Sequence, residues 1–393
     1  MNLKRDNQRK VNTPTSHFLT FPIRVSQICG AFPFSFDETN MSLSFSWKSF
    51  AILMMVTRYI CSLLPPLLSP IITDLHTIFA RVGVTERLSQ IGVNTTSGIA
   101  DIICLVIMLK KRKRIISFFS SFTTKVIHLI KLGIGELTEA EVLEFARRKM
   151  KLNICIGIVL FLGIASHVNT VIFYYQQASQ SGKAWWKVFI VGTVSVYWIA
   201  LDQFRLLTFY FCIGIIASFR AAFTALLILV REKKLRQSRR LWWIIQMYKE
   251  IEVLLEEFQK LFGVQLLNIC FTFLLPMINA GFLISKILTT SHGTNFDIHG
   301  LVTMIPHVIS ATITFSILCD SCSGMTDAAI KCVSSFRNVS AILEFNDDMQ
   351  DKILMFYAQA LANPPRISPG KFMHLGRQAI PSVCQNLKLS ISV

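Results

Sequence analysis

The sequence predicts an all-α fold, a polytopic membrane helical bundle with six transmembrane helices and a cytoplasmic N-terminus. Three observations predict it. The chain has 393 residues, of which 52% are hydrophobic and only 16% are charged, whereas soluble domains carry about 25% charged residues. Six apolar runs are long enough to cross a bilayer core about 30 Å thick, which needs roughly 20 residues of helix. Lys and Arg residues gather between alternate runs, on one side of the predicted bundle.

The six predicted spans are interrupted in places by Pro, Gly or a charged residue, so their ends are approximate. They comprise residues 49–72, 91–109, 152–174, 188–213, 262–287 and 301–318. The segment before the first span has no apolar core typical of a signal peptide, so we expect that span to remain as an anchor. The chain then divides into a cytoplasmic segment (1–48), the bundle (49–320) and cytoplasmic C-terminal helices with a short tail (321–393).

Positive charge predicts the orientation, because short cytoplasmic loops carry an excess of Lys and Arg. With the N-terminus inside, most of the 40 Lys and Arg residues lie on the cytoplasmic side. The predicted outer loops carry only Arg81, Arg87, Lys183 and Lys187. The run 110–114, Lys-Lys-Arg-Lys-Arg, has the composition of a nuclear-localisation signal. Its place directly after a predicted span favours a membrane face instead, so the net charge of +17 does not indicate a nucleic-acid partner.

No residues predict an enzyme, a cofactor or a metal site. Hydrolase, phosphate-binding and dinucleotide-binding motifs are all absent from the sequence. None of the ten cysteines lies in a predicted outer loop. Cys319 and Cys322 form a C-x-x-C pair at the inner end of the sixth span, but a metal site needs about four ligands and no second pair or nearby His supplies them. We interpret them as reduced thiols, with a metal or redox role as the alternative.

Acidic residues in or at the ends of spans are candidates for function, because a charge in the bilayer costs at least about 2.5 kcal/mol on insertion scales. They are Asp101, Asp202 and Asp320. Asp202 lies three residues before Arg205, so both project from one helix face. Mutual neutralisation is therefore favoured over a ligand role for that pair.

The fourth apolar run is too long for one crossing. Residues 188–230 would reach about 65 Å as one helix, about twice the hydrocarbon thickness. Its inner part must leave the membrane and still be covered by protein. Apolar residues recur downstream at helical spacing: Ile251, Leu254, Leu255, Phe258, Leu261 and Phe262. We expect the two segments to pack together as a cytoplasmic helical extension over 214–261, either between subunits or within one.

The predicted outer loops 176–187 and 289–300 are too short to form a binding domain, so a ligand from outside must enter among the helices. Polar and aromatic side chains in the outer halves of the spans and at mid-depth suit a small polar ligand. The candidates are His167, Asn169, Thr170, Tyr174, Tyr197, Trp198, Asn279, Met304 and His307. For any one of them, a helix–helix hydrogen bond or an interfacial anchor is the more common role.

Three common membrane-protein classes fit poorly. A G-protein-coupled receptor has its N-terminus outside and usually an extracellular disulfide. A voltage-gated channel needs Arg at every third residue of its fourth span, whereas Arg205 and Arg220 stand fifteen residues apart. A transporter usually shows an internal repeat, and no convincing repeat is present.

Three motifs resemble those of the arthropod gustatory receptors, relatives of the insect odorant receptors. Residues 30–33 read Gly-Ala-Phe-Pro and follow Ser-Gln-Ile at 26–28. Residues 248–267 include Tyr248, Leu254 and the run Phe-Gly-Val-Gln-Leu-Leu, which looks like the family's entry to its fifth helix. The segment 364–372, Pro-Pro-Arg-Ile-Ser-Pro-Gly-Lys-Phe, is similar to the lead into the family's last helix. With the topology, the resemblance covers about residues 20–380.

This resemblance implies a ligand-gated cation channel in the plasma membrane, a homo- or hetero-tetramer whose subunits have seven helices each. The family's outward-facing pocket takes a small-molecule tastant, and its seventh helices line the pore with a Thr-Tyr…Gln-Phe pattern. Here only twelve polar-rich residues follow Pro381, about 18 Å as helix and too few to cross. We expect the pore helix to be missing and the chain to be unable to conduct alone. The alternative is a multi-pass transporter or a non-conducting membrane scaffold.

Overall fold

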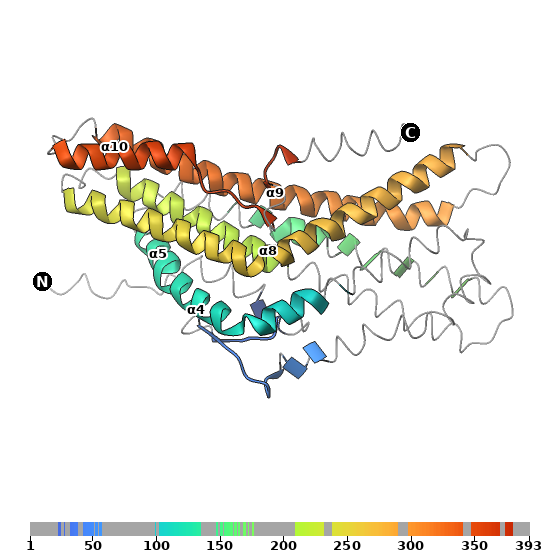
Figure 1. Cartoon of the computed structure of the whole chain (residues 1–393). Helices are drawn as coiled ribbons and strands as arrows, with labels where there is room; N and C mark the ends of the chain where they lie inside the picture. Colours follow the sequence, from blue (N-terminus) through green and yellow to red (C-terminus); the bar gives the residue numbers. More distant parts are fainter. Residues whose placement is uncertain are drawn as a thin grey trace, which may run out of the picture.

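The computed structural model is an elongated bundle of long helices (Figure 1). The residues that it describes are 23–24, 27, 32–37, 42–50, 52–53, 55–56, 99, 102–134, 147, 150–151, 153–159, 161–162, 164–165, 168–169, 172, 175–176, 209–231, 238–289, 298–340, 347–369 and 374–379. Helices α8 and α9 run along each other, and α10 packs on α9 (Figure 1).

The principal elements are few and long. Helix α4 (Arg112–Phe122) continues through the π-helical turn η1 (Thr123–Ile127) into α5 (His128–Ile134), and an unlabelled helix covers 209–231. Helix α8 (Ser238–Thr289) has 52 residues, α9 (Ile298–Ser340) has 43 and α10 (Asp347–Ala362) has 16. At 1.5 Å per residue α8 is about 78 Å long, so a bilayer core holds less than half of it.

Length and composition alone mark three described helices as able to cross a membrane: Arg112–Gly133, Phe209–Arg231 and Val308–Phe336. All three begin later than the predicted spans 91–109, 188–213 and 301–318. The first exposes mainly Lys, Arg, Ser, Thr and His, and the second is almost wholly buried by protein. The apolar residues of these two helices therefore mostly fill a protein core, which composition does not distinguish from contact with lipid.

One helical stretch shows the opposite pattern. Along residues 150–175, which contain the predicted third span, large apolar side chains at helical spacing are exposed. They are Met150, Ile154, Ile158, Phe161, Ile164, Val168, Ile172 and Tyr175. A continuous apolar face left open by the protein is the pattern expected of a helix that faces lipid.

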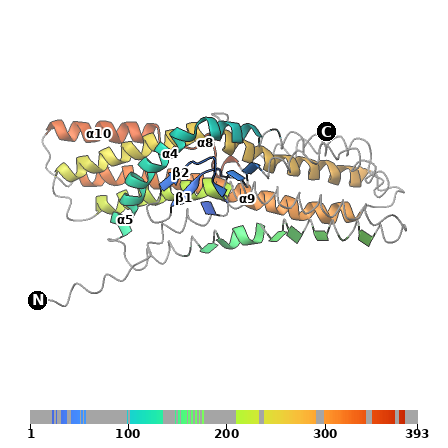
Figure 2. The ribbon, with the colours of Figure 1, turned by 90° about the horizontal axis from the view of Figure 1, so that it is seen from below.

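The expected all-α fold is wrong in one detail, a short antiparallel hairpin near the N-terminus. Strands β1 (Ser35–Asp37) and β2 (Ser42–Ser44) pair in a register that sets Phe36 opposite Leu43. The hairpin lies against α4, midway along the molecule (Figure 2). Strands of three residues are too short for a periodicity argument. Burial of Leu43 and of the preceding Phe34 explains why this segment is held in place.

The predicted packing of 214–230 against 251–262 is confirmed, and it occurs within one chain. Phe219 contacts Phe122 of α4 at 5.3 Å and Phe258 of α8 at 6.1 Å between ring centroids. Phe211 stacks on Phe119 at 5.8 Å. Edge-to-face and offset ring pairs of this kind add to the free energy of burial. The 209–231 helix is thus the centre of a layer, enclosed by α4 and α8.

A second aromatic group attaches α10 to this layer. Tyr248 of α8 contacts Phe223 at 5.2 Å and Phe356 of α10 at 5.3 Å. Phe356 also meets Phe336 of α9 at 5.6 Å. We call the resulting assembly the basal layer: residues 112–134, 209–231, 241–262, 318–336 and 350–362.

Candidate functional site: the junction after α10

The predicted ligand pocket lies largely outside the residues that the structure describes. Those beyond the description are His167, Thr170, Tyr174, Tyr197 and Trp198. Asn169 is described as a half-buried helical residue. Asn279 lies in α8, and Met304 and His307 lie in α9, each with an undescribed side chain. The pocket therefore stays a prediction.

A polar junction is described in detail where the chain leaves α10. The side chain of Gln259 in α8 both donates a hydrogen bond to, and accepts one from, the backbone of residues 366–368. Its Nε2 donates to the carbonyl of Arg366 at 3.0 Å, and its Oε1 accepts the N–H of Ser368 at 2.9 Å. One amide side chain thus satisfies two backbone groups that no helix or sheet would satisfy. These bonds attach the segment after α10 to α8.

Helix α9 also forms a hydrogen bond with the segment after α10. Thr326 donates from Oγ1 to the carbonyl of Pro365 at 2.9 Å. The backbone then folds back, because the N–H of Leu375 donates to the carbonyl of Ile367 at 2.9 Å. Ile367 and Leu375 are both buried. The junction therefore combines a buried apolar underside with hydrogen bonds to two helices.

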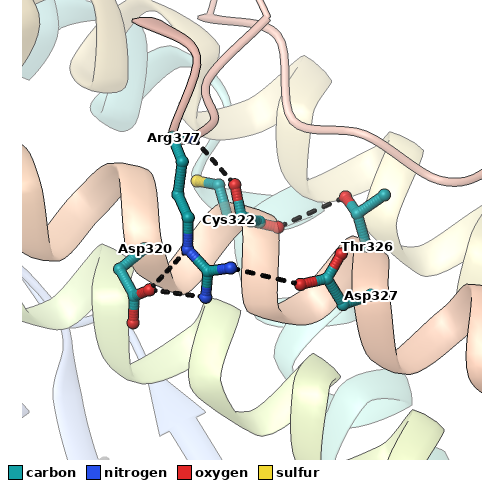
Figure 3. A network of polar contacts seen from close by, with 6 residues as sticks. Asp320, Cys322, Thr326, Asp327 and Arg377 are labelled. Atoms are coloured by element: carbon teal, nitrogen blue, oxygen red, sulfur yellow. Dashed lines mark hydrogen bonds and ion pairs between the residues drawn. The ribbon is translucent and has the colours of Figure 1, made fainter. Parts of the chain in front are cut away.

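Arg377 completes the junction with an ion-pair cluster (Figure 3). Its Nε and one Nη donate to the same carboxylate oxygen of Asp320 at 3.0 and 2.8 Å. Its other Nη lies 3.7 Å from Asp327, and its backbone N–H donates to Ser323 Oγ at 2.8 Å. Asp320, Ser323 and Asp327 share one face of α9 because they lie three and four residues apart. The hydrogen bond with Asp320 raises the pKa of Arg377.

The Arg377–Asp320 pair is exposed, so its contribution to stability is small, about 0.2–1 kcal/mol. The two donors of Arg377 converge on one oxygen of Asp320, so they orient the side chain more than they add to the free energy of folding. The sequence marks Asp320 as a candidate, but its partner lies 57 residues away, and no local pattern connects them.

Two cysteines lie next to this polar network. Cys319 and Cys322 are buried free thiols in α9. Among the described residues, no group of three or more His, Cys, Asp or Glu side chains could hold a metal ion. The hydrogen bonds and ion pairs of the junction connect α8 and α9 to the segment after α10.

The three motifs that carry the family resemblance lie close to this junction and its layer. Gln259, within the motif 248–267, bonds to the motif 364–372. Phe32, within the motif 30–33, packs on Phe211 of the basal layer at 4.8 Å.

The sequence profile of the 7tm chemosensory receptors matches residues 20–384. The chain belongs to the 7tm chemosensory receptor family. This makes it a multi-pass membrane receptor of the insect odorant and gustatory superfamily.

Solved structures share the receptor's fold. The insect olfactory receptor OR5 from Machilis hrabei superposes with a TM-score of 0.68 at 12% identity, covering 96% of this chain and 98% of that chain. The same receptor in complex with eugenol gives a TM-score of 0.65 at 13% identity, covering 96% and 97%. No curated protein matches the chain. Identities this low establish the fold alone.

Proposed function

We propose that this receptor is a gustatory-type subunit of a ligand-gated cation channel in the plasma membrane, with its N-terminus in the cytoplasm. It detects small polar tastants through the outward-facing pocket predicted from the sequence. The observation that carries the proposal is the family match over residues 20–384. The gustatory subtype rests on the three sequence motifs.

The continuity of α8 and α9 supports a coupling mechanism. Asn279, a pocket candidate, and Gln259, at the junction, lie in the same uninterrupted helix. Their separation of 20 residues corresponds to about 30 Å. His307 and Asp320 are connected in the same way by α9. A ligand that favours one arrangement of the outer helices would therefore shift the junction, and with it the segment that follows α10.

Exposed apolar residues in the basal layer support assembly into a tetramer. They are Leu132 of α5, Trp242, Trp243 and Val253 of α8, and Leu354 and Met355 of α10. This layer otherwise exposes charged and polar side chains, so water rather than lipid surrounds it. Apolar side chains in such a surface favour a contact between subunits.

The proposed function is tested by recording ligand-evoked currents. The 393-residue chain should be expressed alone and together with a conducting subunit of the family, and currents recorded during application of sugars and bitter compounds. We expect a ligand-evoked cation current that is absent from cells without this chain. An equal current in cells with and without the chain would contradict the proposal. Uptake of a solute without any current would favour a transporter.

The junction can be tested in the same assay by charge exchange. Asp320→Arg and Arg377→Asp should each weaken the ligand response, and the double variant should recover it, because the pair is re-formed with reversed signs. Lys331→Asp, at an exposed site of α9, is the matched control. Equal responses from all four variants at equal surface expression would show that the junction plays no part in gating.

A further inference from the structure

The exposed face of the helix before α4 changes abruptly from apolar to basic. Ile99, Ile102, Ile103 and Val106 are exposed on that face, Val106 by 56%. Lys110, Lys113 and Arg114 continue the same face at helical spacing and are also exposed. Backbone hydrogen bonds from Lys111 to Ile107 and from Ile115 to Lys111 carry the helical register through the change. Within one turn, the surface passes from hydrocarbon-like to cationic.

The exposed face of helix α8 also changes between charged and apolar residues, and it does so next to Lys111. Its exposed face carries Glu256 and Lys260, then Val264, then Phe271, which is 55% exposed. The ammonium of Lys111 donates to the backbone carbonyl of Lys260 at 2.6 Å. This contact places the two polar-to-apolar changes side by side.

The N-terminal segment supplies a third marker. Trp47 is 63% exposed, and Lys48 beside it is exposed ahead of the exposed Phe50. Trp47 contacts Phe45 edge-on at 5.0 Å, and the Arg112 guanidinium lies 5.5 Å from the centre of the Phe45 ring. Exposed Trp residues are enriched at the edge of the hydrocarbon layer. The helix before α4, helix α8 and the segment around Trp47 therefore all place the boundary between hydrocarbon and phosphate at the same level.

Several cations at this level are left without a protein counter-charge. Lys111 and Arg112 are engaged by the carbonyls of Lys260 and Leu109. Lys260 pairs with Glu256 at 3.4 Å. Within the part of the chain that the structure describes, no carboxylate pairs with the four remaining cations. These are Lys48, Lys110, Lys113 and Arg114. Like charges three and four residues apart destabilise a helix, so an external anion at this site relieves repulsion.

We propose that Lys48, Lys110, Lys113 and Arg114, the basic corner, bind the headgroup of an anionic phospholipid in the adjoining leaflet. Each cation at a membrane surface strengthens such binding about fivefold, so a headgroup with several phosphate charges gains the most. The proposal rests on the proposed orientation, because the anionic lipids lie in the cytoplasmic leaflet.

The test uses the full receptor purified in detergent, with a fluorescent short-chain phosphatidylinositol bisphosphate as the probe. The corner variant carries Lys110→Gln, Lys113→Gln and Arg114→Gln. The matched control removes two Lys and one Arg that are exposed in the basal layer: Lys131→Gln, Arg231→Gln and Lys331→Gln. We expect the corner variant to bind on the order of 100-fold more weakly and the control to change less than threefold.

Several results would overturn the proposal. One is equal binding by the corner variant and the wild type, and another is an equal loss in the corner and control variants. Tighter binding of free inositol trisphosphate than of the lipid would show a soluble ligand rather than a membrane headgroup. A Lys110→Arg, Lys113→Arg variant should bind like the wild type, which separates lost charge from misfolding. The binding assay uses no tastant and measures no current. Its result therefore tests lipid binding even if the proposed channel function is wrong.

Discussion

The two described halves of α8 differ in the charge of their exposed face. In the basal half, Tyr248 and Phe258 are buried while Glu256 and Lys260 are exposed. In the other half, Val264 is exposed and Gln265 is only 2% exposed. This difference agrees with the predicted span 262–287, from which we expect water around the basal half of the helix and lipid around the other half. The buried face is apolar in both halves, with Leu266, Ile269 and Phe273 buried in the second. The halves differ in whether charged side chains stand on the exposed face.

The largest expected effect comes from the core of the basal half. Phe258 is fully buried and contacts Phe118, Phe219 and Phe262 at ring distances of 6.3, 6.1 and 5.4 Å. Phe258→Ala should destabilise the receptor by about 3–5 kcal/mol, because it leaves a cavity among rings. Thermal unfolding followed by size-exclusion chromatography measures it.

Glu257→Ala is the control for Phe258→Ala, since Glu257 is a half-buried residue of the same helix outside the ring contacts. If both variants melt at the same temperature as the wild type, the aromatic contacts do not hold the basal layer together.

Two glycines compare the packed basal layer, where Gly133 lies, with the stretch 150–175, where Gly157 lies on a helix with an exposed apolar face. A Cβ on Gly133 would lie 2.5 Å from the Cβ of Ala225, whereas a Cβ on Gly157 would meet nothing within 4 Å. Gly133→Ala should cost about 1–3 kcal/mol by forcing α5 and the 209–231 helix apart. Gly157→Ala should be neutral or slightly stabilising, because alanine favours helix. Equal melting temperatures for the two variants would mean that α5 and the 209–231 helix can move apart at Gly133 without loss of stability.

The junction should show a smaller effect. Gln259→Glu keeps the acceptor for the N–H of Ser368 but removes the donor to the carbonyl of Arg366. The expected cost is about 1 kcal/mol. Limited proteolysis should show faster cleavage within 363–379 than in the control Gln246→Glu. Unchanged cleavage would indicate that α9 alone holds the segment.

The smallest effect concerns charge on the basal half. Burial, then repulsion by Glu256, raises the pKa of Glu252, while Lys249 lowers it in part. Glu252 therefore stabilises the fold below its unfolded pKa and loses that contribution as the pH rises through its folded pKa. At pH 7, Glu252→Gln should raise the melting temperature by about 1 °C, and the gain should vanish in acid. Glu257→Gln is the control, and a gain that persists in acid would exclude this origin.

Much of the basal layer is predictable from sequence. The spacing of Leu254, Leu255 and Phe258 specifies a buried helix face, and the length of the apolar run before residue 230 requires protein cover beyond the membrane. The contact of Phe219 with Phe258 confirms the buried face and the protein cover, while the position of this layer relative to the membrane stays a prediction. The hairpin at β1 and β2 was missed because three-residue strands carry no measurable period. The predicted pocket lies largely outside the described residues and stays a prediction.

The sequence by itself determined that this protein is helical, that it belongs in a membrane, and to which family its motifs are similar. Those conclusions depend on apolar content, charge placement and local spacing, all of which are properties of neighbouring residues. Only the tertiary structure decided which apolar faces are buried by protein and which stay exposed, because a protein core and lipid favour the same residue types. It alone decided that Gln259 meets Arg366 and that Asp320 meets Arg377. Contacts across such separations depend on how whole helices pack, which no local pattern records.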